Sequence, residues 1–235
     1  MQDINHEIDR LSGIITDLLT LTQMDSHSSP LRVTKVDLSV LTEETVHTLQ
    51  ITAEQKGQTL TADIAPGITL DGDSGKLMQI FYNLTDNAIK YTPDGGAVSV
   101  KLEEQETEMS GRACYRIVVE DTGIGMSKDY LPHIFEEFTR ERTSTESKVA
   151  GAGLGMPIVK ALVDLMGGTV QVESEEGHGT RFTIELELPI ASEQQIHEKK
   201  ENQIEELAKN LNGCRILLAE DNDLNAEIAE AILER

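Results

Sequence analysis

The 235 residues of this chain suffice for one ordinary domain with appendages, and the apolar share of 38% supports a core that must be largely aliphatic, since aromatics make up only 3%. The net charge of −22 argues against nucleic acid or an anionic membrane surface as a partner. We expect no membrane segment in this chain, because it has no signal peptide and no apolar run near the roughly 20 residues of a membrane helix. Cys114 and Cys214 form no metal-spaced cluster, which favours a reducing, cytoplasmic compartment and is compatible with a membrane-anchored parent protein.

A long helix is predicted over residues 3–25, because apolar residues recur there at alternating steps of four and three. Its wide apolar face requires a partner helix, which is either missing from this chain or supplied by another subunit. The serines and the proline of residues 26–35 indicate a linker. We therefore assign residues 1–28 to the helix and residues 29–35 to the linker.

A compact domain is expected over residues 36–190. Asp73 or Ser74 can cap its central helix, which ends at Pro93 and the glycines that follow. The patterns predict, in order, a helix over 36–56, a strand over 58–64, the central helix over 75–91, paired strands over 97–102 and 113–120, one or two short helices within 127–138, a polar loop over 139–152, a helix over 155–166, and a hairpin of strands 169–174 and 180–188.

The remaining residues suggest a linker and the start of another domain. Residues 191–212 are rich in Glu, Lys and Gln and are predicted to form a solvated linker helix. Residues 214–219 are typical of a buried parallel strand, and Glu220 and Asp221 stand at its carboxyl end. One strand and the start of a helix have nothing to pack on, so residues 213–235 are expected to begin a domain that is truncated here.

The central helix carries a polar flank beside its apolar stripe. Asn83, Asn87 and Tyr91 lie four residues apart, with Asp86 and Lys90 beside them. Amide and carboxylate oxygens suit Mg²⁺, which also shares substrate phosphates, and the lysine can meet a phosphate. The alternative is the solvated polar face of an ordinary amphipathic helix.

Two glycine-rich segments follow. In Asp121-Thr-Gly-Ile-Gly-Met126, the aspartate at a strand end can accept a hydrogen bond from an exocyclic amine, and Gly123 and Gly125 let the backbone approach a flat base; a plain turn is the alternative. Gly151-Ala-Gly-Leu-Gly155 precedes a helix and can offer N–H groups to a phosphate. It follows a polar loop rather than a strand, which disfavours dinucleotide binding of Rossmann type.

In order and spacing, these motifs closely resemble the catalytic ATP-binding domain of sensor histidine kinases. The resemblance covers about residues 36–190. It extends to 3–25, which resembles the second helix of the family's dimerisation hairpin, and to 216–222, which resembles the first strand of a receiver domain. This is the layout of a hybrid histidine kinase. The matching segments are Asn83 to Tyr91, Asp121 to Gly125, Phe135 with Phe138, and Gly151 to Gly155, which correspond to the N, G1, F and G2 boxes.

The resemblance implies an α+β fold, namely a two-layer α/β sandwich of the Bergerat (GHKL) type, with the dimerisation helix before it and an incomplete α/β receiver segment after it. ATP and Mg²⁺ are the implied ligands, and residues 139–152 would form a lid hinged by the two phenylalanines. At the phosphate end, the resemblance implies that Asn87 and Asn83 bind Mg²⁺, that Lys90 binds a phosphate, and that the backbone of Gly151, Gly153, Leu154 and Gly155 faces the phosphates. It also implies that Tyr91 lies beside the nucleotide, that Asp121 accepts a hydrogen bond from the adenine amine, and that Thr180 lies near the adenine. Asp86 would act as a general base or orient the attacking group, and Glu220 and Asp221 would bind the Mg²⁺ of the receiver. Arg140, Arg142 and Lys148 in the lid either meet phosphate or are solvated.

The resemblance also implies a substrate histidine and the partner domains that receive the phosphoryl group. His6-Glu-Ile8 matches the family's phosphorylation site only superficially, because Asp9-Arg10-Leu11 stands where the family has a basic residue, a threonine and a proline. We expect the chain to lack its phosphoacceptor histidine and to phosphorylate a histidine domain of the same or a partner protomer. A homodimer is expected, and the partner that receives the signal would be a receiver domain or a response regulator. Two alternatives stay open: another GHKL-type ATPase, and a nucleotide-binding scaffold without catalysis. The histidines expected to be surface residues are His6, His27, His47, His133, His178 and His197.

Overall fold

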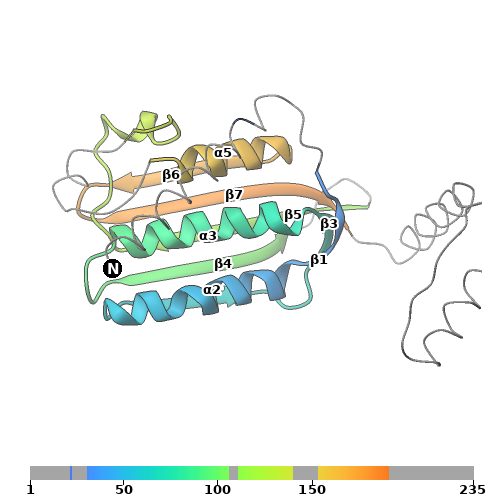
Figure 1. Ribbon diagram of the computed structural model, residues 1–235, viewed down its shortest axis with the longest axis horizontal. Coiled ribbons are helices and arrows are strands. Elements are labelled where there is room, and N and C mark those ends of the chain that lie inside the picture. Colours follow the sequence, from blue (N-terminus) through green and yellow to red (C-terminus); the bar gives the residue numbers. More distant parts are fainter. Residues whose placement is uncertain (1–21, 23–30, 106–110, 140–152, 191–235) are drawn as a thin grey trace, which may run out of the picture. The chain divides into compact units, whose positions relative to one another are not determined.

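A five-stranded mixed sheet with helices on one face dominates the described part of the chain (Figure 1). The computed structural model describes residue 22 and residues 31–105, 111–139 and 153–190; the predicted N-terminal helix, most of the lid and everything after residue 190 lie outside this set. The elements are β1 (Thr34–Asp37), α2 (Leu38–Gln55), β2 (Thr59–Ile64), β3 (Thr69–Gly72), α3 (Ser74–Tyr91), β4 (Ala97–Gln105), β5 (Arg112–Asp121), the 3₁₀ helix η1 (Leu131–His133), α5 (Gly155–Leu165), β6 (Thr169–Glu175) and β7 (Gly179–Pro189).

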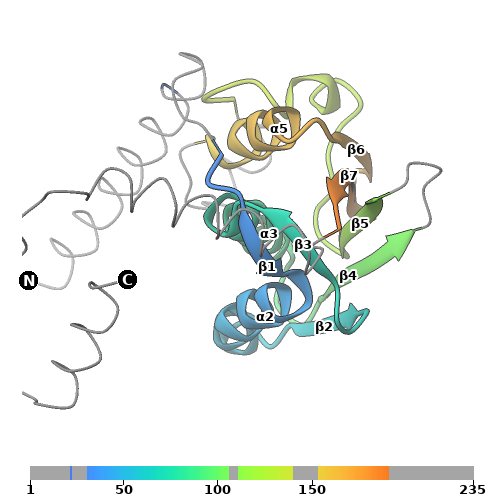
Figure 2. The same cartoon turned by 90° about the vertical axis from the view of Figure 1, so that its right-hand side faces the viewer.

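The strands lie in the order β2-β4-β5-β7-β6. Strands β2 and β4 pair in parallel, and the other neighbours pair antiparallel. Helices α2, α3 and α5 lie side by side on one face, so the domain has two layers (Figure 2). This arrangement confirms the predicted α+β class. No helix among the described residues combines the length and the apolar character that crossing a membrane requires.

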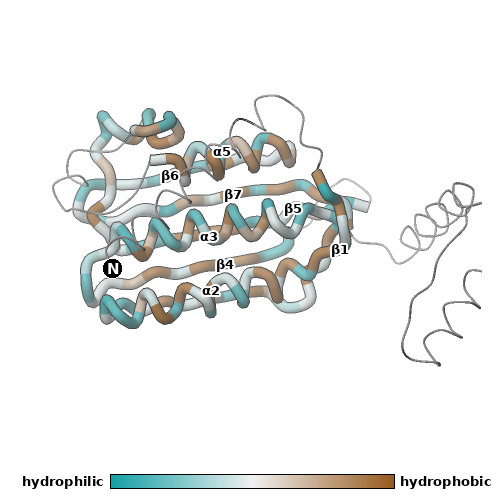
Figure 3. The backbone as a smooth tube through the Cα atoms, viewed as in Figure 1, coloured by the Kyte–Doolittle hydropathy of each residue, from teal (hydrophilic) through white to brown (hydrophobic). Residues whose placement is uncertain are grey.

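The core lies between the two layers. Strand β5 alternates strictly, with Ala113, Tyr115, Ile117 and Val119 buried toward the helices. Helix α3 buries a stripe at helical spacing and packs against α2 on one side and α5 on the other (Figure 3). Full burial stabilises each large aliphatic side chain by about 1.5–3 kcal/mol. The central helix is therefore fixed along its length, and its polar flank is held beside α5.

The helix starts follow the predicted chemistry. Asp73 caps α3 by accepting a hydrogen bond from the N–H of Lys76 at 3.2 Å, as expected. Asp37 caps α2 in the same way, accepting from the N–H of Val40 at 2.9 Å. The prediction that the α2 helix opens at Val36 was wrong, because Val36 belongs to strand β1 and is buried there.

Several other boundaries differ from the prediction. Strands β1 and β3 form a two-stranded antiparallel sheet that the sequence analysis missed, since four residues each are too short for a periodic signal. Strand β4 continues to Gln105 and β5 runs from Arg112 to Asp121, so both are longer than the predicted strands 97–102 and 113–120. Within 127–138, only the 3₁₀ turn η1 forms in place of the expected helices.

Candidate functional site

The amides of α3 meet the first turn of α5. A methyl group built on Gly155 would lie 3.4 Å from Asn87 Nδ2 and 3.5 Å from Asn83 Oδ1, so the helix start lies next to both side chains, with room for little more than a methyl group between them. Asn83 Nδ2 is buried without a hydrogen-bond partner. No side chain caps α5, whose first N–H groups lack intrahelical acceptors. These groups form a polar corner with unmet hydrogen-bonding capacity, which an anion with its counter-ion would fill.

The donor set at this corner fits Mg²⁺ only in company with a ligand. Amide oxygens of Asn83 and Asn87 are the hard donors that Mg²⁺ accepts. Across the described ranges, no group of three or more His, Cys, Asp and Glu side chains is placed to hold a metal. A bound Mg²⁺ would therefore need oxygens from a phosphate to complete its shell.

The outer part of the polar flank is an ion pair. Lys90 Nζ lies 2.5 Å from Asp86 Oδ2, one turn away on α3. The lysine side chain is 41% exposed and the aspartate side chain only 17%. The ammonium is thus accessible to a ligand from solution, and its ion pair with the carboxylate keeps it on the polar flank of α3.

The C-terminal end of α3 meets the loop after β5. The N–H of Ile124 donates to the Tyr91 carbonyl at 3.1 Å, and the N–H of Gly123 donates to Asp121 Oδ1 at 2.8 Å. A methyl group on Gly123 would come within 2.6 Å of both the Tyr91 carbonyl and the Asp121 carboxylate. Glycine is therefore required here by close packing, and the loop is fixed against the helix.

Asp121 is a buried carboxylate, only 7% exposed. Burial raises its pKa to about 6, although backbone N–H groups of Gly123 and Thr180 oppose the rise by hydrogen bonding to the charged form. Thr180 is its neighbour in the β5–β7 register. A desolvated acceptor at a strand end is suited to a ligand that donates a hydrogen bond.

The same loop is locked to the β6–β7 turn. Gly125 has φ +63°, and any side chain there would collide with the Glu175 carbonyl. Ser174 Oγ accepts from the N–H of Met126 at 2.9 Å and lies 2.9 Å from Thr180 Oγ1. Ser174 was missed by the sequence analysis, and the only signal was a serine at the end of a predicted strand.

A hydrogen bond joins the residues that flank the segment 140–152. The N–H of Phe138 donates to the Gly153 carbonyl at 3.1 Å, and both residues have positive φ, 60° and 73°. Phe135 packs partly buried against the core, whereas Phe138 is 58% exposed, and the hinge role of both stays a prediction. Leu154 is buried, so only its backbone can face a ligand. The predicted site residue Gly151 and the lid cations Arg140, Arg142 and Lys148 lie outside the described residues.

Three of the histidines can be assessed. His47, His133 and His178 are exposed, as predicted. His133 Nδ1 lies 2.7 Å from Glu136 Oε1, within one turn of chain. His6, His27 and His197 lie outside the described residues, as do Glu220 and Asp221.

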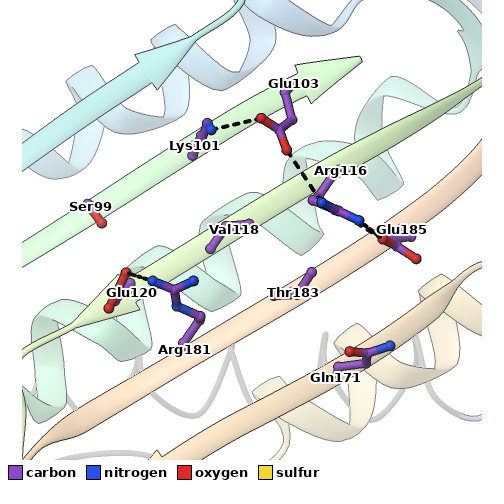
Figure 4. Close-up of a pocket in the computed structure, with 10 residues that line it drawn as sticks. All are labelled: Ser99, Lys101, Glu103, Arg116, Val118, Glu120, Gln171, Arg181, Thr183 and Glu185. Carbon is purple, nitrogen blue, oxygen red and sulfur yellow. Dashed lines mark hydrogen bonds and ion pairs between the residues drawn. The ribbon is translucent and has the colours of Figure 1, made fainter. Parts of the chain in front are cut away.

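Apart from this site, a hollow of about 460 Å³ lies on the sheet face opposite the helices (Figure 4). Its cations are already paired: Lys101 with Glu103 at 2.8 Å, and Arg116 with Glu185 at 2.6 Å. Arg181 likewise lies 2.7 Å from a glutamate of β5. These exposed pairs satisfy one another, so the hollow offers no unmet charge to a ligand.

Comparisons with known proteins agree with the fold described above. A family model described as "Histidine kinase-, DNA gyrase B-, and HSP90-like ATPase" matches residues 72–190. The sensor protein GacS of Pseudomonas syringae pv. syringae is 34% identical over 233 residues, which are 98% of this chain and 25% of that protein. The hybrid signal transduction histidine kinase K of Dictyostelium discoideum is 31% identical over 236 residues, covering 97% of this chain and 19% of that one. The chain thus spans a quarter or less of the length of these two relatives.

Among solved structures, full-length ShkA in complex with AMPPNP matches with a TM-score of 0.68 and 29% identity. The match covers 81% of this chain and 38% of that one.

Proposed function

Because the chain belongs to the family of histidine kinase-, DNA gyrase B- and HSP90-like ATPases, we propose that residues 36–190 act as the ATP-binding catalytic domain of a hybrid sensor histidine kinase in phosphorelay signalling. The domain is homologous to the ATPase domains of hybrid sensor kinases. One observation carries the proposal: the start of α5 at Gly155 lies next to Asn83 and Asn87 of α3, and the carbonyl of Tyr91, also on α3, accepts the N–H of Ile124 in the loop that follows Asp121.

The base end of the nucleotide is proposed to lie at Asp121. Its buried carboxylate would accept a hydrogen bond from the adenine amine, with Gly123 and Gly125 allowing close approach of the backbone. Thr180 lies near the carboxylate and would border the base. The support is the burial of Asp121 and the fixed loop around it.

The phosphate end is proposed to lie between α3 and the start of α5. Asn83 and Asn87 would hold Mg²⁺ with phosphate oxygens, and Mg²⁺ would there neutralise phosphate charge in a chain of net charge −22. Lys90 would meet a phosphate, and Tyr91 would flank the nucleotide. The uncapped N-terminus of α5 supports this assignment. The backbone of Gly151, Gly153, Leu154 and Gly155 would face the phosphates.

The proposed reaction transfers the γ-phosphoryl group of ATP to a histidine that this chain does not supply. The imidazole nitrogen forms a bond to the γ-phosphorus, and the bond from that phosphorus to the bridging oxygen breaks, so ADP leaves. Asp86 would accept or orient the imidazole proton as the nitrogen attacks. Its low exposure beside Lys90 supports a role at the rim of the site.

The flanking segments are proposed to supply the partners. Residues 1–28 would be the second helix of a dimerisation hairpin, joined by the linker 29–35, and would make a homodimer. Residues 191–212 would link the kinase domain to a receiver that begins at 213, with Glu220 and Asp221 as part of its Mg²⁺ site.

The proposed compartment is the cytoplasm, which supplies ATP and keeps a free thiol such as that of Cys114 reduced.

The test is titration of the purified chain with ATP, with and without Mg²⁺, followed by phosphotransfer to a supplied dimerisation domain from a related kinase. We expect Mg²⁺-dependent binding and a phosphorylated histidine on the added domain. A chain that retains no adenine nucleotide would contradict the proposal. Rapid steady-state hydrolysis without any acceptor would instead favour an ATPase of chaperone or topoisomerase type.

A further inference from the structure

The last turn of α3 is held from outside by two side chains of the α2–β2 junction. Lys56 Nζ donates to the carbonyl oxygens of Ile89 at 2.7 Å, Lys90 at 3.3 Å and Thr92 at 2.9 Å. Gln58 Nε2 donates to two of the same oxygens, those of Ile89 at 3.0 Å and Thr92 at 2.6 Å. The last carbonyls of a helix have no intrahelical donor, so these bonds replace water. We call this pair the Lys56–Gln58 clamp.

The way in which α2 ends sets the two donors in place. Gly57 has φ +62°, and its N–H donates to the Glu54 carbonyl at 2.9 Å. The N–H of Gln58 donates to the Ala53 carbonyl at 3.0 Å, which completes a Schellman-type turn. Lys56 and Gln58 flank that glycine, and both side chains reach α3 from there. Gln58 is only 5% exposed, so its bonds are shielded from water.

The same turn of α3 is tied on its other side to the candidate site. The Tyr91 carbonyl accepts the N–H of Ile124, and the Ala88 carbonyl accepts both the N–H and the hydroxyl of Thr92. Every carbonyl from Ala88 to Thr92 therefore has a donor, and those not bonded within the turn or to Ile124 are bonded to the clamp. A cation beside a helix C-terminus also faces the negative end of the helix dipole.

We propose that Lys56 and Gln58 are positioning residues for nucleotide binding. By fixing the last turn of α3, they set the direction of Lys90 and Tyr91 and, through the Tyr91 carbonyl, the loop that bears Asp121. Neither clamp residue touches the nucleotide; both act through the backbone of α3. This inference rests on the proposed function, because the effect is read at the ATP site.

The test replaces Lys56 by methionine, which keeps the length of the side chain and removes its donors and charge. We expect ATP to bind about three- to tenfold more weakly, the range expected when a cation at a helix C-terminus is lost. Phosphotransfer at saturating ATP should keep its rate, because contacts to the adenine, which does not react, act equally in the ground and transition states. Lys56→Arg should recover most of the affinity, since it keeps both charge and donors. Lys101→Met, which removes an exposed ammonium on the opposite face of the sheet, is the matched control.

A readout without nucleotide accompanies the titration. Hydrogen exchange at the amide of Ile124 should be faster in Lys56→Met than in wild type, while the amides of β7 keep their rates. If wild type binds ATP and Lys56→Met binds it equally well, the role of the clamp is overturned and the proposed function stands. Failure of Lys56→Arg to recover affinity also overturns that role. A wild-type chain that binds no ATP overturns both.

Discussion

Replacing Asp121 by asparagine should make the domain more stable at neutral pH and at the same time weaken its ATP binding. The side chain is only 7% exposed, and its pKa is raised from 3.8 to about 6 by burial. The folded protein therefore holds this proton to a higher pH than the unfolded chain does. Stability is unaffected by the group below about pH 4 and falls as pH rises to about 6, where the full cost of the buried charge is reached.

The cost follows from the size of the pKa change. A rise from 3.8 to about 6 corresponds to about 3 kcal/mol at about 1.4 kcal/mol per pKa unit. Asparagine has the same shape and no charge, but only its oxygen can accept, so one of the N–H groups of Gly123 and Thr180 can lose its acceptor at a cost of about 1 kcal/mol. The net gain in the free energy of unfolding should be about 2 kcal/mol at pH above about 7.

Urea denaturation at about pH 5 and about pH 7.5 measures this, and the gain should grow by about 1.5 kcal/mol between them. ATP affinity should fall about 100-fold, because the amide nitrogen presents a donor to the adenine amine. Asp164→Asn, at an exposed aspartate of α5, is the control and should change neither quantity. A gain that does not depend on pH would refute the account of the buried charge. Unchanged ATP affinity would refute the adenine assignment.

Three further changes separate the site from its scaffold. Gly155→Ala places a methyl group 3.4 Å from Asn87 Nδ2, in the space proposed for Mg²⁺ and phosphate, so calorimetry should show about tenfold weaker Mg²⁺-dependent ATP binding. The control, Gly75→Ala in the first turn of α3, should leave binding unchanged. Arg116→Ala breaks exposed ion pairs on the open face of the sheet. It should lower the free energy of unfolding in urea by less than about 1 kcal/mol and leave ATP binding intact. A larger loss would mean that these ion pairs contribute substantially to the stability of the fold. Tyr115→Phe removes a buried hydroxyl that has no partner and should be neutral or stabilise by about 1 kcal/mol in thermal melts, whereas destabilisation would reveal a bound water.

Much of the site was predictable because its residues are close in sequence. Asn83 and Asn87 share a flank of α3 because four residues make about one helical turn. The capping of α3 by Asp73 followed from a single residue type at a helix start. Gly123 and Gly125 are also needed to make room for the Tyr91 and Glu175 carbonyls, which the sequence did not indicate. Their role in letting a base approach stays a prediction.

Other features could not be predicted, because their partners are distant in sequence. Strands β1 and β3 are too short for a periodic pattern and form only through each other. Ser174 joins the loop after β5 to Thr180 only when β6 lies beside β7. The Lys56–Gln58 clamp looks in the sequence like two ordinary polar residues around a helix stop.

Among the described residues, the sequence by itself determined helices α2, α3 and α5, most strands and the chemical character of each motif, because these depend on residues within one or two turns of one another. Only the tertiary structure decided that the start of α5 lies next to the amides of α3, that Asp121 is buried, and that the end of α3 is held by Lys56. These facts depend on which surfaces meet when the apolar faces of the helices and the sheet are buried together. Local patterns record that such a face exists but not which polar groups its burial will bring into contact.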